Sequence, residues 1–368
     1  MSTQAIQKSN SSFSIFSSLF KNKPELKEVP QKAFQGEPSS KSQLQSVEAR
    51  KKMNPNQVLA GKESDPAVQA LLGLVDTVKE KVSKFLEPRF DAKDLYDPSG
   101  NPKGSDINQD ALGDCYFVAT LGAIADQQPD QIKNAIQYEE KSGKFTVTLN
   151  EKNSWWLGGD KGRQTQVEVS QLDLLRNLEK GGGSTVDNNP GTDGPIWPAV
   201  METAFAKLNN EDWEKDWSKG KKDGFEPIAH GGYQEDAMFA VTGNKGEWLK
   251  VGSSEKEMNE AYDKINQALS NGQAVTLGTK KEYKDFWSFL TGKTVPQDGL
   301  QDRHAYQLQT IRRDSNNEIF IKVRNPWAHN KNIGEGLDNN NAVVEVKLKT
   351  LVNTEGLGGI NIGPKMGK

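Results

Sequence analysis

The sequence predicts an α+β fold whose first part is mainly helical and whose second part is rich in sheet. Apolar residues recur at helical spacing in residues 115–125 and again in residues 197–208. Strand-like runs come later in the chain, at residues 305–311 and 319–324, joined by turn-forming polar residues. We therefore expect a helical lobe followed by an antiparallel sheet.

Weaker signals fill in both parts. Short strands are expected at residues 145–149 and 166–169. The second part is predicted to contain a helix at 257–269 and strands at 274–277 and 342–348. Three further segments are expected to be connecting structure: a glycine-rich surface loop at 181–194, a hinge at Gly231–Gly232, and a glycine-containing tail after Leu351 that adds little.

Composition limits the classes of function. The chain has 368 residues, so one or two domains are expected. A formal net charge of -3 gives no reason to expect nucleic acid as a partner. The single cysteine excludes an internal disulfide, and no apolar stretch approaches the roughly 20 residues that span a bilayer.

The N-terminal part differs in composition from the rest. Residues 1–63 are rich in Ser, Gln, Lys and Pro, which predicts a disordered tail. Apolar residues at helical spacing between 68 and 85 predict an amphipathic accessory helix within residues 64–94. Residues 13–20 contain apolar residues, but serines interrupt them, so the segment is too polar for the apolar region of a secretory signal. We expect a cytoplasmic protein, or one exported without such a signal.

The only cysteine lies at a predicted helix start. Asp114 precedes Cys115 and resembles an N-cap, so the thiol is expected in the first turn of the helix. There the helix dipole favours a negative charge and is expected to lower the pKa of the thiol. The alternative is that Cys115 is only a small buried hydrophobic residue.

A histidine and an asparagine supply partners for this thiol. The strand-like runs after His304 and before Asn325 are predicted to form a hairpin about the turn at residues 314–317. In this hairpin, the residue numbers of two residues that lie opposite each other are expected to add up to about 629–631. His304 and Asn325 then lie opposite or diagonal on one face, where an Asn amide can hold the imidazole in one tautomer.

Together, these segments resemble the protease core of the calpain family. The resemblance rests on Gln109 to Tyr116, on His304-Ala305-Tyr306 and on Arg324-Asn325-Pro326-Trp327. Supporting matches in the family's order are residues 196–208, Gly231–Gly232 and residues 239–243. The similarity covers roughly residues 95–346. It implies a papain-like protease of two lobes, at residues 95–230 and 231–368, with the active site in the cleft between them.

The resemblance also implies roles for individual residues. Cys115 matches the nucleophile, His304 the general base and acid, and Asn325 the residue that orients the imidazole. Gln109 matches the oxyanion-hole side chain, and Trp327 the indole that covers the His–Asn contact. Gly113 and Asp114 are expected to support the site. Protein or peptide substrates follow from this similarity.

Some positions depart from the family pattern. Asp110 stands where the family usually has Gly, and Tyr116 where it usually has Trp. Arg303 replaces the Gly that normally precedes the histidine, so it is expected to narrow the cleft or to place a cation near the acyl site. None of these changes removes a reacting group.

No cofactor is expected. His230 and His329 have no Cys, His or paired carboxylate at metal-ligand spacing. In calcium-regulated members of the family, an ion bound in each lobe aligns the two halves of the triad. Asp106 matches one such ligand, but Lys331 stands where the family has a second-lobe glutamate, and an ammonium repels the ion. Calcium dependence is therefore predicted to be absent.

The function expected from the resemblance is a cysteine endopeptidase that works through a thioester acyl-enzyme. Two alternatives remain open from the sequence. One is another acyl-transfer enzyme that uses a similar Cys-His-Asn triad. The other is a binding protein with the protease fold that does not turn over, although such a role does not require all four of Gln109, Cys115, His304 and Asn325.

Overall fold

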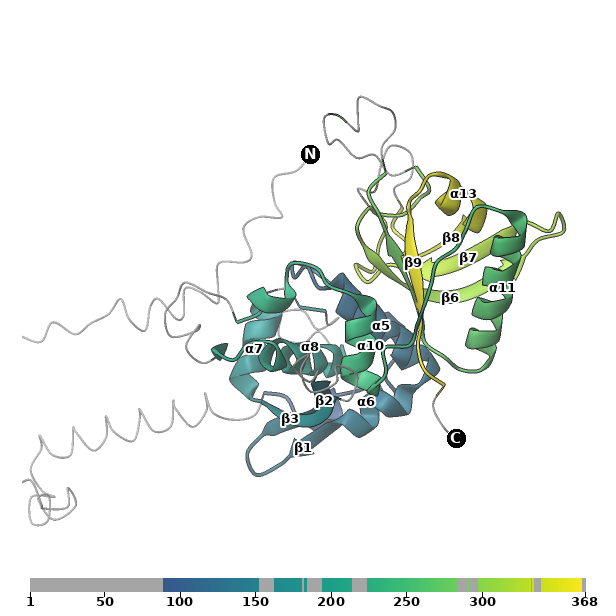
Figure 1. Cartoon of the computed structure of the whole chain (residues 1–368). Helices are drawn as coiled ribbons and strands as arrows, with labels where there is room; N and C mark the ends of the chain where they lie inside the picture. Colours follow the sequence, from purple (N-terminus) through teal and green to yellow (C-terminus); the bar gives the residue numbers. More distant parts are fainter. Residues whose placement is uncertain are drawn as a thin grey trace, which may run out of the picture. The chain divides into compact units, whose positions relative to one another are not determined.

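The computed structural model of the chain describes residues 89–151, 162–180, 182–183, 194–213, 224–282, 290, 297–331, 333 and 339–365. All of them belong to one unit that spans residues 86–368 (Figure 1). The tail expected at 1–63 and the apolar stripe expected at 68–85 lie outside the described residues. Of the segment 64–94, only the end is described, and it contains the short 3-10 helix η2 (Ala92–Asp94).

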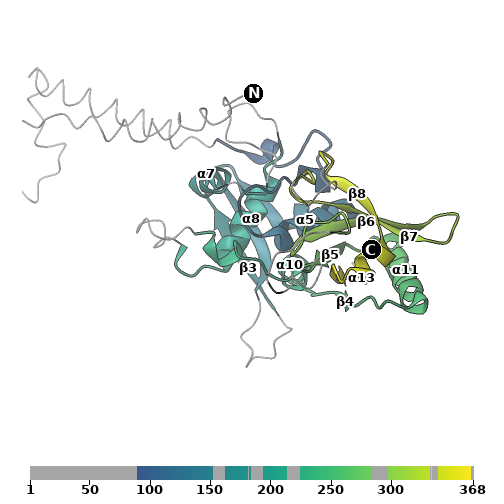
Figure 2. The same cartoon turned by 90° about the horizontal axis from the view of Figure 1, so that it is seen from above.

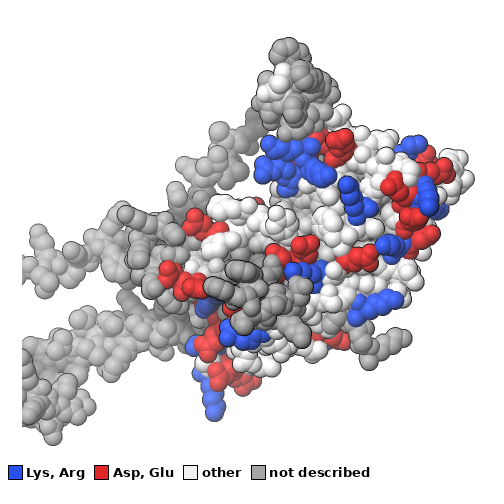
Figure 3. All heavy atoms as spheres, viewed as in Figure 1, with Lys and Arg blue, Asp and Glu red and all other residues white. Residues whose placement is uncertain are grey.

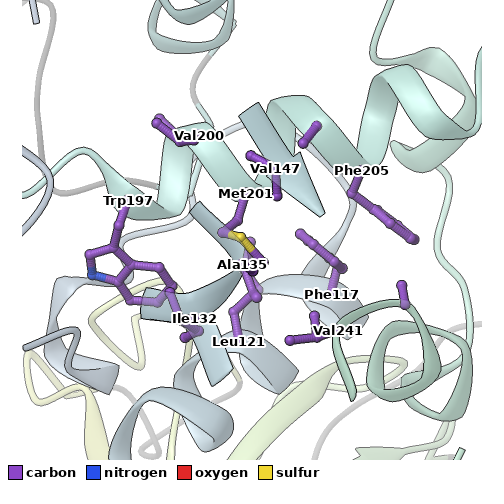
Figure 4. Close-up of a cluster of buried hydrophobic side chains, with 14 of the residues drawn as sticks. Phe117, Leu121, Ile132, Ala135, Val147, Trp197, Val200, Met201, Phe205 and Val241 are labelled. Atoms are coloured by element: carbon purple, nitrogen blue, oxygen red, sulfur yellow. The ribbon is translucent and has the colours of Figure 1, made fainter. Parts of the chain in front are cut away.

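The first lobe is built around two buried helices that the sequence predicted. They are α5 (Cys115–Gln127) and α8 (Trp197–Leu208). Their apolar faces meet in the core, where the rings of Phe117 and Phe205 stack with centroids 4.0 Å apart (Figure 4). The remaining helices of this lobe are short: η3 (Gly104–Asp106), α6 (Pro129–Ala135), α7 (Gln171–Glu179), η5 (Glu226–Ile228) and α10 (Gln234–Thr242).

A small antiparallel sheet completes the first lobe. Its strands are β1 (Ile136–Glu139), β2 (Lys144–Glu151) and β3 (Arg163–Val169), in that order. Every second residue of β2 is buried, which gives one apolar face that packs against α8. The two strands predicted here from the sequence correspond to β2 and β3.

The second lobe is a six-stranded antiparallel sheet in the order β4-β9-β5-β6-β7-β8 (Figure 2). Helix α11 (Glu255–Ser270) packs against β6 and β5 through its apolar stripe. The fold class predicted from the sequence is thus confirmed, with a helical first lobe and a sheet-rich second lobe. The remaining elements are β4 (Glu247–Leu249), β5 (Val275–Thr279), β6 (Ala305–Arg313), β7 (Ile319–Arg324), β8 (Val343–Lys347), α13 (Leu348–Asn353) and β9 (Leu357–Ile362).

The predicted hairpin is present. Strands β6 and β7 pair with Gln307 opposite Arg324, which is the expected register, and a shift of one residue follows between Leu308 and Thr310. The turn closes through a hydrogen bond from Asp314 N–H to Glu318 O of 3.0 Å. The hairpin brings His304, just before β6, next to the end of β7.

Three expectations about the connecting segments were wrong. The tail after Leu351 contains β9, which lies between β4 and β5 inside the sheet. Helix α10 follows the expected hinge at Gly231–Gly232, yet it packs against α5 and joins the core of the first lobe. Of the surface loop expected at 181–194, Gly182 and Gly183 are buried beside Glu202, and residues 181 and 184–193 lie outside the described residues.

The two lobes make direct contacts along one side of α5. This helix packs against β5 and β6. The guanidinium of Arg324, at the end of β7, donates to the carbonyl oxygens of Ser105 and Ile107 at 3.3 and 3.1 Å. Gln307 on β6 donates to the carboxylate of Asp126 on α5. These hydrogen bonds fix the start of β6 and the end of β7 against the first lobe.

Candidate active site

Cys115 and His304 line the same cleft, which has a volume of about 440 Å³. Cys115 is the first residue of α5, and His304 immediately precedes β6. The backbone N–H of Ala305 faces the sulfur closely enough to favour its anionic form, so the thiol lies beside the residue that follows His304. Gly231 and Gly232 also line this cleft.

Asn325 fixes the tautomer of His304. The Nε2 atom of His304 lies 2.9 Å from Oδ1 of Asn325. Since Oδ1 can only accept, Nε2 must carry the proton and donate. In the neutral ring, Nδ1 then keeps its lone pair and is free to take a proton from the thiol.

The orientation of the Asn325 amide is set by Asn330, a residue that the sequence analysis missed. Asn330 Nδ2 donates to the carbonyl oxygens of Asn341 and Ala342 at 2.6 and 3.3 Å. Its Oδ1 therefore faces Asn325 and accepts from Nδ2 of that residue at 3.1 Å. This turns Oδ1 of Asn325 towards His304. Nothing in the local sequence shows that β8 brings residues 341 and 342 to Asn330.

Aromatic rings enclose the histidine. The centroid of Trp327 lies 4.4 Å from that of His304, and its backbone N–H donates to Oδ1 of Asn325 at 3.0 Å. Trp327 thus covers the His–Asn contact, as the resemblance implied. Tyr306 lies perpendicular to the imidazole at 5.1 Å. Asn325 is fully buried, so water does not compete for the contact.

Both reacting groups are neutral in this conformation. Burial raises the pKa of the Cys115 thiol to about 11, although hydrogen bonds from the N–H groups of Ala305 and Tyr116 oppose the shift. Burial lowers the pKa of His304 to about 4, although Asn325 opposes that shift. The expectation that the helix start lowers the thiol pKa was wrong, because the loss of solvent outweighs the helix dipole here.

Gln109 lies next to the site, but its amide points inward. Its side-chain nitrogen donates to the carbonyl oxygen of Leu112 and to Oδ1 of Asp114. Both amide hydrogens are therefore used within the chain. Gln109 lines a neighbouring cavity of about 470 Å³ together with Trp327 and His329. Its backbone N–H donates to the carbonyl oxygen of Pro326 at 2.7 Å, which keeps it beside the His–Asn pair.

Asp114 does not cap α5 with its side chain, contrary to the sequence prediction. Its carboxyl is fully buried and forms a hydrogen bond with the carboxyl of Glu202 from the middle of α8. Burial raises the pKa of both groups, most strongly that of Asp114. A glutamate inside the otherwise apolar run of residues 197–206 is a sequence signal that could have revealed this partner.

Gly113 allows the chain to approach itself closely just before the cysteine. A Cβ atom at this position would lie 2.2 Å from the carbonyl oxygen of Ala229. The contact forms a parallel bridge to His230, and the N–H of Gly231 donates to the carbonyl oxygen of Gly113 at 2.9 Å. Gly113 thereby positions one glycine wall of the cleft.

Asp106 and Lys331 stand at the two positions matched to calcium ligands. Asp106 accepts hydrogen bonds from the indole N–H of Trp197 at 2.7 Å and from the backbone N–H of Lys103 at 2.9 Å. Lys331 lines the cavity next to Gln109. Within the described ranges, no group of three Cys, His, Asp or Glu residues is arranged to hold a metal ion.

A two-lobed α+β fold, with a cysteine at a helix start facing a His–Asn pair on a sheet, defines the papain-like class of cysteine proteases. Comparison with known proteins agrees with this class. The profile described as calpain family cysteine protease matches residues 90–350, which is most of the chain. The chain therefore belongs to the calpain family of cysteine proteases.

Several curated relatives are similar over this region. The maize calpain-type cysteine protease DEK1 is 24% identical over 265 residues, which are 67% of this chain and 10% of that protein. The Neurospora crassa calpain-like protease palB/cpr-8 is 27% identical over 229 residues (60% and 22%). The human calpain-2 catalytic subunit is 22% identical over 287 residues (75% and 36%). The chain thus spans only about a tenth to a third of these relatives.

Proposed function

We propose that the protein is a cysteine endopeptidase that cleaves polypeptide substrates through a thioester acyl-enzyme. Cys115 is the nucleophile, His304 the general base and acid, and Asn325 the residue that orients the ring. The observation that carries the proposal is the contact between His304 Nε2 and Asn325 Oδ1, which leaves Nδ1 as the acceptor in the cleft that holds the thiol.

The first half of the reaction starts from the neutral thiol and the neutral imidazole. His304 Nδ1 takes the thiol proton while the sulfur attacks the scissile carbonyl carbon, so the thiolate is consumed as it forms. The imidazolium that results is stabilised through its Nε2–H and Asn325 Oδ1. It then gives its proton to the leaving amine, the C–N bond breaks, and the acyl group stays on Cys115 as a thioester.

The second half regenerates the enzyme. Neutral His304 takes a proton from water, and the hydroxide oxygen attacks the thioester carbonyl. The C–S bond breaks, the sulfur regains the proton from His304, and the carboxylic acid product leaves. The ring therefore has to be neutral at the start of both halves, which its lowered pKa favours at neutral pH.

Two donors are proposed for the oxyanion. The backbone N–H of Cys115 belongs to the first turn of α5, where N–H groups have no partner within the helix. The Gln109 amide is the second donor, and it has to rotate away from Leu112 O and Asp114 before it can serve. Each oxyanion donor typically lowers the barrier by roughly 2.7–4 kcal/mol. Substrate binding is the step proposed to drive this rotation.

We also propose that the enzyme works without calcium. The contacts that support this are the inter-lobe hydrogen bonds of Arg324 and Gln307, which hold the His304–Asn325 side against the Cys115 side without an ion. Asp106 already accepts two hydrogen bonds, and Lys331 places a cation at the second matched position. Oxygen ligands that are anionic and free are what Ca²⁺ needs.

The proposed substrates are proteins and peptides rather than nucleic acids, and the proposed location is the cytoplasm or a place reached without a secretory signal. A lone reactive thiol suits a compartment that keeps cysteines reduced. Among the described residues, no helix is long and apolar enough to cross a membrane.

Cleavage of an unfolded polypeptide tests the proposed function. The purified full-length chain is incubated under reducing conditions with a denatured protein, and fragments are identified by mass spectrometry. We expect cleavage by the wild type and none by Cys115→Ala, with equal thermal unfolding of the two proteins. Undiminished cleavage by Cys115→Ala would contradict the proposal.

A further inference from the structure

The cleft that holds Cys115 and His304 is lined by three cations and, among the described residues that line it, by no carboxylate. The cations are Lys280, Lys281 and Arg303. All three are exposed, and none forms an ion pair with another described residue. The chain as a whole has a net charge of -3, so this cleft is locally opposite in sign to the protein.

The fold brings these cations to the catalytic histidine. Strands β5 and β6 pair with Gly278 opposite Ala305, and the same register continues beyond the strands. The N–H of Thr279 donates to the carbonyl oxygen of His304, and the N–H of His304 donates to Oγ1 of Thr279, each at 2.9 Å. Lys280 follows Thr279 and Arg303 precedes His304, so both cations adjoin this hydrogen-bonded pair in the chain.

Arg303 occupies a backbone conformation that favours glycine. Its φ angle is 52°, in the left-handed region that side chains with a Cβ rarely adopt. The side chain is exposed, and no ion pair within the described part of the chain stabilises this conformation. Disfavoured backbone of this kind concentrates at functional sites, where the side chain it presents is used.

The carboxyls next to these cations in the sequence, Glu282 and Asp302, are buried and face other groups. Asp302 accepts a hydrogen bond from the N–H of Glu282 at 3.1 Å. Glu282 accepts from the hydroxyl of Thr354 at 2.6 Å and from the N–H of Gln297. Burial and Glu282 raise the pKa of Asp298 to about 8, so that carboxyl is largely neutral at pH 7. In the surface view, a group of Lys and Arg side chains has an acidic group beside it, and further basic and acidic side chains are spread over the rest of the face (Figure 3).

We propose that this cleft selects peptides that carry Asp or Glu side chains close to the scissile bond, with Arg303 as the main specificity-determining residue. The inference rests on the proposed function and names its substrate class. A substrate carboxylate that enters the cleft meets the guanidinium directly before His304, and Lys280 lines the same cleft. The exposed rings of Tyr233 and Trp248 line the same cleft and supply apolar contact for the rest of the peptide.

Cleavage-site profiling tests this selectivity. A library of peptides from a digested proteome is exposed to the full-length protein, and the residues around each new terminus are counted. We expect Asp and Glu to be enriched at one or two positions relative to the uncut library. A matched pair of peptides, one with Glu and one with Gln at that position, then gives the ratio of their kcat/KM values.

Three variants locate the origin of the ratio. Arg303→Gly suits the positive φ angle and removes the cation, and it is expected to lower the Glu-to-Gln ratio by about tenfold, the size of one hydrogen bond to a charged group. Arg303→Glu is expected to reverse the preference towards Lys peptides. Lys141→Glu makes the same change of charge in the exposed turn between β1 and β2 and is expected to leave the ratio unchanged. Higher ionic strength is expected to lower the wild-type ratio.

The outcomes distinguish a failure of the proposed acidic specificity from a failure of the proposed protease function. An absence of acidic enrichment in an otherwise active wild type overturns the specificity, and so does a ratio that survives Arg303→Gly or falls equally with Lys141→Glu. An absence of any cleavage, together with an absence of covalent labelling at Cys115, overturns the proposed function itself.

Discussion

Asp114 and Glu202 hydrogen-bond to each other inside the core of the first lobe, one residue away from the candidate nucleophile. Glu202 accepts further hydrogen bonds from the Asn177 amide and from the N–H of Gly183, which is 3.0 Å from each of its oxygens. Oδ2 of Asp114 has no donor facing it. Two carboxylates cannot hydrogen-bond without a proton, so Asp114 carries the proton and Glu202 is the anion.

A proton on Asp114 rather than on Glu202 predicts opposite effects on stability for the isosteric substitutions Asp114→Asn and Glu202→Gln. Asp114→Asn supplies an N–H to Glu202 and an oxygen to the Gln109 amide, so the variant is expected to fold and to cleave peptides. The wild type must bind a proton at Asp114 that the unfolded chain lacks above pH 3.8. Between about pH 4 and the raised pKa of Asp114, the stability of Asp114→Asn relative to the wild type should therefore increase by about 1.4 kcal/mol per pH unit.

Glu202→Gln is the matched variant and is expected to destabilise the protein by about 1–3 kcal/mol. It replaces an oxygen acceptor with an amide that faces the N–H donors of Asn177 and Gly183. Urea unfolding of both variants between pH 5 and pH 8 measures the two effects. A destabilised Asp114→Asn beside a tolerated Glu202→Gln would place the proton on Glu202 instead.

The protonation of Cys115 can be followed by alkylation. A thiol with a pKa of about 11 has about 300-fold less thiolate at pH 7 than a free cysteine with a pKa near 8.5. Iodoacetamide should therefore modify the free enzyme slowly at pH 7, at a rate that rises with pH up to about 11. The urea-unfolded protein, whose cysteine is exposed, is the control. A fast rate that does not change between pH 5 and pH 8 would indicate a preformed thiolate–imidazolium pair.

Asn330 is predicted to act through Asn325. Asn330→Ala removes the group that orients the Asn325 amide and leaves Nδ2 of that residue without its acceptor. We expect kcat to fall by roughly tenfold or more with a smaller change in KM, because a misplaced imidazole affects the reaction rather than binding. Asn316→Ala, in the exposed hairpin turn, should change neither value. An unchanged kcat for Asn330→Ala would show that Asn325 needs no such support.

Two experiments test calcium independence: the addition of a chelator to the wild type, and the substitution Arg324→Gln. Activity of the wild type should persist in excess chelator, since direct hydrogen bonds hold the lobes together. Arg324→Gln removes the contacts to Ser105 and Ile107 and should lower activity by about tenfold, because a loss of alignment between Cys115 and His304 is costly. A strict requirement for millimolar calcium, restored when the ion is added back, would contradict this account.

The sequence predicted the parts of the fold that depend on local patterns. The β6–β7 hairpin follows from alternation and from the turn at residues 314–317, so its register was confirmed. Strand β9 was missed because its glycines indicate a loop when read locally. In the fold they permit close contact: a Cβ at Gly358 would lie 2.7 Å from the carbonyl oxygen of Gly278, and one at Gly359 would lie 2.3 Å from the Trp248 ring.

The parts of the site that were missed depend on tertiary contacts. The residues of the Cys-His-Asn set are each marked by a motif; the structure places Cys115 and His304 in one cleft and the buried Asn325 against His304. The protonation states are set by burial, which no motif carries, so the thiol pKa was predicted in the wrong direction. Asn330 and Glu202 were also missed, because their hydrogen-bond partners come from other segments of the chain.

Peptide cleavage is proposed to pass through an acyl group on Cys115. Mixing the protein with an activated peptide ester and quenching with acid within seconds traps this intermediate. We expect a mass increase on the peptide that contains Cys115, removable by hydroxylamine and absent in Cys115→Ala. Turnover without any adduct, continuing at the same rate in Cys115→Ala, would contradict it.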